Sequence, residues 1–221
     1  MAKKSNYTIA ILDEEALERG RFVKFLKDEF TIVQIPFASS VDDLISKIKE
    51  LGVDAIAIDY KLKDHDSRFK ENGDFFFKNL IAQLQGFPAF ILTKDADKAR
   101  KESKLINPRF IISKRILYPK LASEEDRIGF KDILKYEIQV HQAVIQDKTK
   151  RVNALEKLRL KNKLDESQEN EYIELNNELS KMITGHNEIP MKFFSVETNK
   201  KLDDIISKTD ALIKKIGKKK K

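Results

Sequence analysis

The sequence predicts an α/β fold over residues 1–120, with a five-stranded parallel sheet, followed by an all-α region over residues 121–221. Short apolar runs alternate with segments of helical periodicity in the first part, an order typical of parallel sheets with helices on both faces. The later apolar runs are continuous, which favours strands buried on both sides. After about Pro119 the strand signals vanish and charge density rises, so we expect a domain boundary near residue 120.

The first three strands and two helices follow from local periodicity and capping residues. Leu17, Phe22 and Phe25 recur at helical spacing in the first helix. Ser40 is a suitable N-cap for the second helix, and Gly52 ends it. In chain order, we expect a strand at Tyr7–Leu12, a helix at Glu15–Phe30, a strand at Thr31–Ile35, a helix at Val41–Leu51 and a strand at Val53–Asp59.

The second half of the sheet begins after a polar loop that we expect at Tyr60–Asn72. Gly73 opens the next helix, and Gly86-Phe87-Pro88 ends it. The remaining segments are a strand at Phe90–Leu92, a short helix at Ala96–Lys104 and a strand at Phe110–Ser113.

The all-α region begins with a long helix that carries a heptad seam with two polar interruptions. Near Asn162 this helix breaks, and Asp165 with Gln168 three residues on is the pattern of a new helix start. Two helices joined so closely predict an antiparallel hairpin. A last helix is expected at Glu197–Ile216, before the lysine tail. The seam is Leu134, Ile138, His141, Ile145, Lys148, Val152 and Leu155, and the facing stripe is Tyr172, Leu175, Leu179 and Met182.

Composition limits the classes of protein that fit. The chain has 221 residues, of which 36% are charged, and its cysteine count of zero excludes disulfides and thiolate metal sites. No apolar run approaches the ~20 residues of a membrane span, and we expect a cytoplasmic protein with no membrane partner. The net charge is +7, partly from Lys218–Lys221. We interpret that tail as a solvated terminus, because the basic residues lack interleaved aromatics and give weak support for nucleic-acid binding.

Polar side chains gather where the predicted strands end. Asp13 and Glu14 follow the first strand, Asp59 ends the third, and Thr93 and Lys114 follow the fourth and fifth. The carboxyl ends of parallel strands meet at one edge, where sites form. Two carboxylates ~4 Å apart repel by roughly 4 kcal/mol at an effective dielectric of 20, so such a cluster takes up a proton or binds a cation.

Oxygen ligands without histidine or cysteine favour Mg²⁺ as that cation. Thr93 adds a hydroxyl, and Lys114 adds a point charge suited to phosphate. Together these groups are the parts needed to form and hold an acyl phosphate on Asp59. A dinucleotide site is excluded by the acids that replace a glycine-rich loop. No catalytic set appears in the helical region, so we do not expect an enzyme.

The first ~120 residues resemble the receiver domain of two-component response regulators, with its flavodoxin-like fold. The resemblance rests on the acidic start at Leu12-Asp13-Glu14-Glu15, on Asp59 followed by Leu62, and on Gly73, Thr93 and Lys114 in order. It implies that Asp59 accepts phosphate and that Thr93 and Lys114 contact the phosphoryl group. It also implies that Asp13, Glu14, Asp59 and the backbone carbonyl of Lys61 bind Mg²⁺.

Several positions depart from the family pattern. Glu14 replaces the commoner Asp, Lys94 follows Thr93 where a small residue is usual, Ile111 stands where a switch aromatic is common, and Arg115 replaces a proline. These departures affect the expected readout more than the acceptor. The two positions that tune phosphate lifetime in the family carry Lys61 and Asp95, and we hypothesise that they pair over the phosphoryl group and prolong its lifetime.

We therefore expect a phosphorylation-dependent signalling protein of a phosphorelay. Its partners would be a sensor histidine kinase or phosphotransfer protein and, through the helical region, a protein effector or a second copy in a homodimer. One alternative is a DNA-binding transcriptional regulator whose helices and lysine tail contact phosphates. Another is a degenerate receiver that keeps the fold and acts as an interaction scaffold without phosphorylation.

Overall fold

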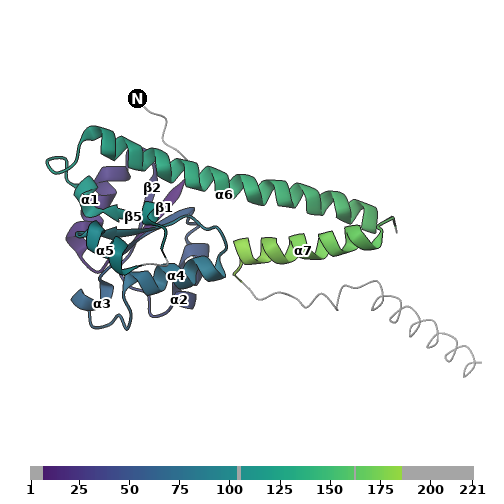
Figure 1. Cartoon of the computed structure of the whole chain (residues 1–221), viewed down its shortest axis with the longest axis horizontal. Coiled ribbons are helices and arrows are strands. Elements are labelled where there is room, and N and C mark those ends of the chain that lie inside the picture. The colour runs from purple at the N-terminus through teal and green to yellow at the C-terminus, as the bar shows by residue number, and fades with distance from the viewer. Residues whose placement is uncertain (1–6, 104–105, 162, 186–221) are drawn as a thin grey trace, which may run out of the picture. The chain divides into compact units, whose positions relative to one another are not determined.

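A computed structural model describes residues 7–103, 106–161 and 163–185 (Figure 1). Its sheet contains β1 (Thr8–Leu12), β2 (Thr31–Ile35), β3 (Ala55–Asp59), β4 (Ala89–Thr93) and β5 (Ile111–Ser113). All neighbouring strands are parallel, in the order β2-β1-β3-β4-β5. This is the flavodoxin-like order, which confirms the predicted fold class. The helix expected at Glu197–Ile216 and the lysine tail lie outside the described residues.

The helices of the described part follow the predicted order, with three short additions. The additions are α3 and two 3₁₀ turns, η1 and η2, which lie inside segments expected to be loop or strand. The bounds are α1 (Ala16–Leu26), α2 (Val41–Glu50), α3 (Leu62–His65), α4 (Gly73–Gln83), α5 (Ala96–Glu102), η1 (Pro108–Phe110), η2 (Lys114–Leu117), α6 (Glu124–Arg159) and α7 (Glu166–Ile183).

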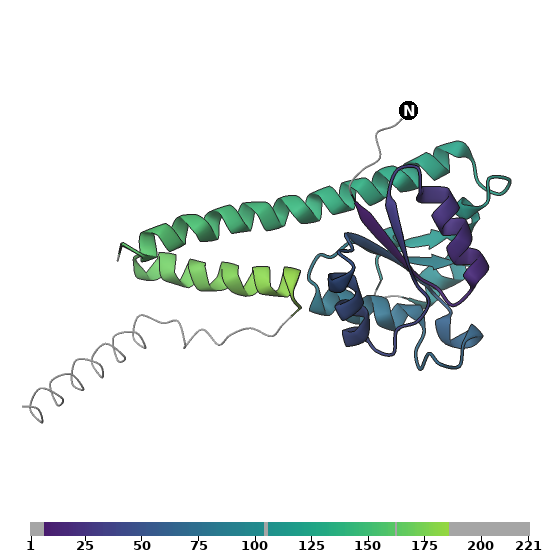
Figure 2. The ribbon, with the colours of Figure 1, turned by 180° about the vertical axis from the view of Figure 1, so that it is seen from behind.

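Successive residues of each central strand belong to different cores, because strand side chains alternate between the faces of a sheet. Leu12 and Ile58 pack against α2, α4 and α5, whereas Ile11 and Ala57 pack against α1 and the first turns of α6. Figures 1 and 2 show helices on both sides of the sheet. The helical contributors to the second core are Phe22, Phe25 and Leu26 of α1 and Phe130, Leu134 and Ile138 of α6.

Two local predictions need correction. Leu17 was expected on the apolar face of the first helix, but it is 63% exposed, and the neighbouring Glu18 is 1% exposed instead. The buried position is filled by a carboxylate because Arg21 and Tyr118 hydrogen-bond to it. The segment 60–72, expected to be a polar loop, contains α3 and buries Phe69. An aromatic cluster with Phe37 and Phe76 accounts for that burial.

The chain divides into two compact units, Met1–Val144 and Ile145–Lys221. The first unit extends beyond residue 120 because the first turns of α6 complete its core. Glu29 also holds these turns by ion pairs of 2.7 Å to Lys131 and 2.6 Å to Lys135. The predicted seam therefore serves two cores: Leu134 and Ile138 pack in the first unit, while Val152 and Leu155 are buried in the second.

The described part of the second unit is an antiparallel helical hairpin, as predicted. Asp165 caps α7 in a capping box with Gln168, also as predicted. Ion pairs join Lys148 to Glu178 and Arg151 to Glu171 across the hairpin. The stripe on α7 differs in one position: Ile173 is buried together with Leu179 and Met182, while Tyr172 and Leu175 are only half-buried. Among the described helices, none is long and apolar enough to cross a membrane.

Candidate functional site

Strand register brings the predicted site residues to one edge of the sheet. Leu12 pairs with Ile58, so Asp13 and Asp59 follow neighbouring positions at the carboxyl ends of β1 and β3. Asp59 in turn pairs with Leu92, the residue before Thr93. Lys114 follows Ser113, the last residue of β5, and begins η2. We call Asp13, Glu14, Asp59, Thr93 and Lys114 the acid pocket.

Lys114 joins the two aspartates in the centre of the acid pocket. Its Nζ lies 2.8 Å from Asp13 Oδ2 and 2.5 Å from Asp59 Oδ1. All three side chains are at least 94% buried. Burial by itself lowers the pKa of Lys114, but the charges of Asp59 and Asp13 outweigh it and raise that pKa above its usual value. The lysine therefore stays charged and acts as the counter-ion of both acids.

The second oxygen of Asp59 is held by the backbone. The N–H of Lys61 donates to Asp59 Oδ2 at 2.7 Å, so both oxygens of this carboxylate have a fixed direction. Gly73 is held close to this turn, since its N–H donates to the carbonyl of Tyr60 at 3.0 Å. A Cβ at Gly73 would lie 1.8 Å from the carbonyl oxygen of Asp59. A glycine is thus required there by close approach of the backbone.

Glu14 supplies a carboxylate without a partner. Both of its oxygens are buried, and no hydrogen-bond donor of another described residue reaches them. Burial is the main cause that raises the pKa of Glu14 to about 7; the charges of Asp59 and Asp13 act in the same direction, while the backbone N–H of Glu14 itself and the charge of Lys114 act in the opposite direction. A buried acceptor left unsatisfied is costly, so this position favours a proton or a cation as its partner.

The loop after β4 places Thr93 next to Lys94 and Asp95. The hydroxyl of Thr93 accepts the N–H of Asp95 at 3.3 Å, which leaves its O–H available to donate. Lys94, the departure from the family pattern, forms a 2.9 Å ion pair with Glu15. That pair links the loop after β4 to the loop after β1. The large residue at position 94 therefore has a partner that sequence reasoning missed.

The two positions expected to tune phosphate lifetime do not pair with each other among the described residues. The Nζ of Lys61, the residue before α3, lies 3.6 Å from Asp64 Oδ2 of that helix. Asp95 instead caps α5, where its Oδ1 accepts the N–H of Lys98 at 3.1 Å. Lys61 follows Asp59 by two residues and Asp95 follows Thr93 by two residues, and their effect on phosphate lifetime stays a prediction. Ile111 is buried in the sheet core, where it offers no mobile ring.

The fit of a metal to the acid pocket can be judged from its donors. Within residues 7–103, 106–161 and 163–185, no three histidine or acid side chains are grouped to hold a metal ion. Lys114 lies between Asp13 and Asp59 and supplies their positive charge. Three carboxylates still face a single ammonium, and Glu14 has two oxygens without donors. The donor chemistry and the unbalanced charge therefore fit a hard cation such as Mg²⁺.

Comparisons with known proteins add little to this description. No protein-family model matches the chain, and no curated protein matches it. Structural matches include a yeast Spc42 trimeric coiled-coil segment in a fusion protein, which is 20% identical with a TM-score of 0.48 and covers 70% of this chain and 93% of that one.

Two further matches are an anti-anti-sigma factor and a receiver domain. The anti-anti-sigma factor PhyR from Bartonella quintana is 13% identical with a TM-score of 0.47, over 65% of this chain and 53% of PhyR. A response-regulator receiver domain from Bacteroides fragilis is 17% identical with a TM-score of 0.44, over 61% of this chain and 98% of that domain. At these scores the similarities carry no argument about function. The resemblance to receiver domains rests on the strand order and on the residues of the acid pocket.

Proposed function

We propose that this chain is a phosphorylation-dependent signalling protein of a two-component system, in which Asp59 accepts a phosphoryl group from a histidine kinase or a phosphotransfer protein. The observation that carries the proposal is the pairing of Asp59 with Lys114 at the carboxyl edge of the sheet, at 2.5 Å. A lysine in contact with the acceptor supplies the positive charge that a transferred phosphoryl group needs.

The proposed reaction uses a lone pair of Asp59. Each carboxylate oxygen has two lone pairs, and the contacts with Lys114 and the Lys61 N–H occupy one on each oxygen. Attack of the other lone pair on phosphorus forms the acyl P–O bond as the P–N bond of the donor phosphohistidine breaks. The electron pair of that bond returns to the imidazole. The Thr93 hydroxyl and the Lys114 ammonium then stabilise the oxygens of the phosphoryl group.

Mg²⁺ fits this reaction as a cofactor. Asp13, Glu14 and Asp59 would hold it together with the backbone carbonyl of Lys61, and it would offset negative charge on the transferred group. Because Glu14 is protonated below about pH 7, and metal ligands must be deprotonated, we expect Mg²⁺ binding to strengthen as pH rises through 7.

The helical region provides the proposed output. Phosphorylation adds a charge of about −1.5 to −2 next to Lys114, and η2 connects this lysine to the segment that leads into α6. The carbonyl of Ile116 in η2 accepts a hydrogen bond from Arg127 of α6 at 2.6 Å. A displacement of Lys114 would therefore move η2 and, through the hydrogen bond between Ile116 and Arg127, the start of α6.

An apolar stripe on α6 is a candidate contact surface for an effector or a second copy. It consists of Ile133, Tyr136, Val140 and Val144, which recur at spacings of three or four and are 44%, 63%, 41% and 38% exposed. Residues at this spacing share one face of a helix, and the face lies apart from Leu134 and Ile138, which enter the core. We propose that phosphorylation changes the access or orientation of this stripe.

Intact mass measurement after treatment with a small phosphodonor and Mg²⁺ tests the acceptor. The parent should gain one phosphoryl group and Asp59→Asn none. Asp64→Asn, which changes an exposed acid of α3, should gain one phosphoryl group like the parent. A mass gain of one phosphoryl group in Asp59→Asn would exclude Asp59 as the acceptor. A parent that takes up no phosphate would instead favour the degenerate scaffold.

Hydrogen exchange and sedimentation test the output. With an acyl-phosphate mimic, we expect altered exchange in residues 115–150. Tyr136→Lys should abolish any association that the mimic induces, while Tyr172→Lys on the hairpin should not. Unchanged exchange and unchanged oligomeric state would exclude α6 as the output element.

A further inference from the structure

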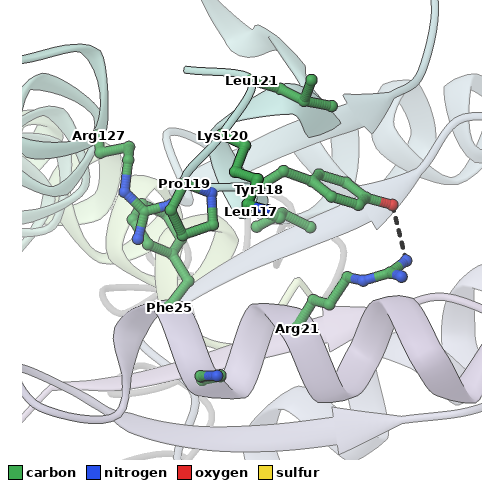
Figure 3. A pocket seen from close by; sticks show the side chains of 9 residues that line it. Arg21, Phe25, Leu117, Tyr118, Pro119, Lys120, Leu121 and Arg127 are labelled. Carbon is green, nitrogen blue, oxygen red and sulfur yellow. Dashed lines mark hydrogen bonds between the residues drawn. The ribbon is translucent and has the colours of Figure 1, made fainter. Parts of the chain in front are cut away.

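A cavity separate from the acid pocket lies between α1 and the segment that joins η2 to α6. Its volume is about 600 Å³, within the range of small-molecule sites. Figure 3 shows Arg21 and Phe25 of α1 on one side and Leu117 to Leu121 on the other, with Arg127 at one end. None of the acid-pocket residues lines it.

One wall of the cavity is fixed by a buried acid. The hydroxyl of Tyr118 donates to Glu18 Oε1 at 2.6 Å. Arg21 Nη1 donates to the same carboxylate oxygen and to the Tyr118 hydroxyl, both at 2.7 Å, and its guanidinium lies 4.5 Å from the centre of the Tyr118 ring. Glu18 is 1% exposed. This network orients the aromatic ring and balances the charge of Arg21 inside the protein.

Two lysines of the cavity have no acidic partner to balance their charge. Within the part of the chain that the structure describes, neither Lys24 nor Lys120 shares an ion pair. Arg127, by contrast, donates to the carbonyl of Ile116, and its buried Nε forms an ion pair of 3.6 Å with the carboxylate of Glu124. The lining contains no acidic residue. The cavity therefore presents an excess of positive charge to anything that enters it.

The rest of the lining is apolar. Phe25, Leu117 and Pro119 contribute hydrocarbon surface, and Leu121 is 61% exposed. The Arg127 guanidinium lies 4.6 Å from the centre of the Phe25 ring, which keeps a flat aromatic wall next to a cation. An exposed large apolar side chain next to unpaired lysines favours a ligand that has both an apolar body and a negative charge.

We propose that this cavity binds a small amphiphilic organic anion, with an aromatic or branched apolar body against Phe25, Leu117 and Leu121 and one anionic group between Lys24 and Lys120. The apolar body displaces water from the hydrocarbon walls. The anionic group receives charge-assisted hydrogen bonds from the two lysines. The site goes beyond the proposed phosphotransfer, because it shares no residue with the acid pocket.

Titration of the full chain with naphthalene-1-sulfonate tests the proposal. This probe joins an aromatic body to a sulfonate anion, which cannot act as a phosphoryl donor. We expect saturable binding, observed by heat or by amide chemical shifts in residues 17–27 and 115–128. Sodium sulfate and 1-naphthol, which each carry one half of the probe, should bind at least roughly tenfold more weakly. Equal binding of 1-naphthol would overturn the anionic part of the site.

Variants locate the site. Lys24→Gln and Lys120→Gln should each weaken binding roughly threefold to tenfold, the range of a charge-assisted contact near the surface. Lys27→Gln changes an exposed lysine one turn further along, outside the cavity, and should bind like the parent. Leu121→Asp should abolish binding, and unchanged circular dichroism would show that each variant is folded.

A matched variant in the acid pocket separates this site from the proposed function. Asp59→Asn should leave sulfonate binding unchanged even where it abolishes phosphorylation. A lack of saturable binding to the parent would overturn the proposal, as would equal losses in Lys24→Gln and Lys27→Gln. Loss of binding in Asp59→Asn would show that the probe binds in the acid pocket, and this result would also overturn the proposal.

Discussion

Asp13 and Asp59 share one buried ammonium, whereas Glu171 and Glu178 meet their cations on the exposed surface of the hairpin. The Lys114 side chain is 3% exposed, while those of Arg151 and Glu171 are 49% and 40% exposed. Distances in the two regions are nevertheless similar, at 2.8 Å for Lys114 to Asp13 and 2.6 Å for Arg151 to Glu171.

Burial, and not distance, decides what these pairs do. Water screens and competes for the exposed pairs, so they contribute little to stability. In the acid pocket, loss of one partner leaves a charge that no water can solvate. The comparison teaches that the charge density of the hairpin reflects a solvated surface, while a few charges at the sheet edge form a site.

The largest expected effect comes from Lys114→Met. At pH 7 this variant should lose about 3–5 kcal/mol of unfolding free energy, because it strands two buried carboxylates. Urea denaturation provides the measurement. Addition of Asp13→Asn should recover part of the loss, since it removes one stranded charge. A double variant whose losses simply add would show that Lys114 and Asp13 are not coupled.

Gly73→Ala should lower the unfolding free energy by about 3 kcal/mol or more. The new methyl would lie 1.8 Å from the carbonyl oxygen of Asp59, so backbone must move. Gly129→Ala in α6 is the matched control, because nothing lies within 4 Å of its Cβ. That control should gain about 0.5–1 kcal/mol from helix propensity. Equal stabilities for the two variants would contradict the close approach at Gly73.

Leu155→Ala tests whether the hairpin has a core of its own. Leu155 is 0% exposed, and its truncation should cost about 2–3 kcal/mol within the second unit. Hydrogen exchange should accelerate in residues 145–183 and stay unchanged in β1 and β3. Acceleration throughout the sheet would show instead that the two units unfold together.

Glu14→Gln tests the orphan carboxylate. Its pKa is raised, so its contribution to stability is fully present below pH 4.5 and is lost as pH rises through about 7. After allowance for solvent screening, the unfolding free energy of Glu14→Gln should exceed that of the parent by about 1–2 kcal/mol at about pH 8.5. At about pH 4.5 the two unfolding free energies should be equal. The exposed Glu50→Gln serves as control. A pH-independent difference would contradict the raised pKa.

The smallest effect is expected for Arg151→Ala. Its pair with Glu171 is exposed to solvent, so thermal unfolding should not change outside the error of measurement. A clear loss of stability, persisting at high salt, would show that the hairpin relies on its charges as the acid pocket does, and would remove the contrast between the two regions.

Local patterns were sufficient for much of the fold. The ends of β1, β3 and β5, the N-cap at Ser40 and the capping box at Asp165 follow from periodicity and from side chains that bond backbone groups three residues away. The gathering of acid-pocket residues at one edge also follows from sequence, because parallel strands align their carboxyl ends.

Other features depend on contacts between distant residues. The reversal of Leu17 and Glu18 requires Tyr118, 100 residues away. The pairing of Lys94 with Glu15 spans 79 residues. None of these partners can be chosen by a local pattern.

The sequence by itself determined which residues end the strands and which chemistry they offer. Only the tertiary structure decided that Lys114 lies between Asp13 and Asp59, that Glu14 has no donor, and that the seam of α6 is divided between two cores. The physical reason is that chain periodicity fixes the face on which a side chain lies. The partner of that side chain, its burial and hence the strength of its electrostatic interactions depend on which distant segment packs against that face.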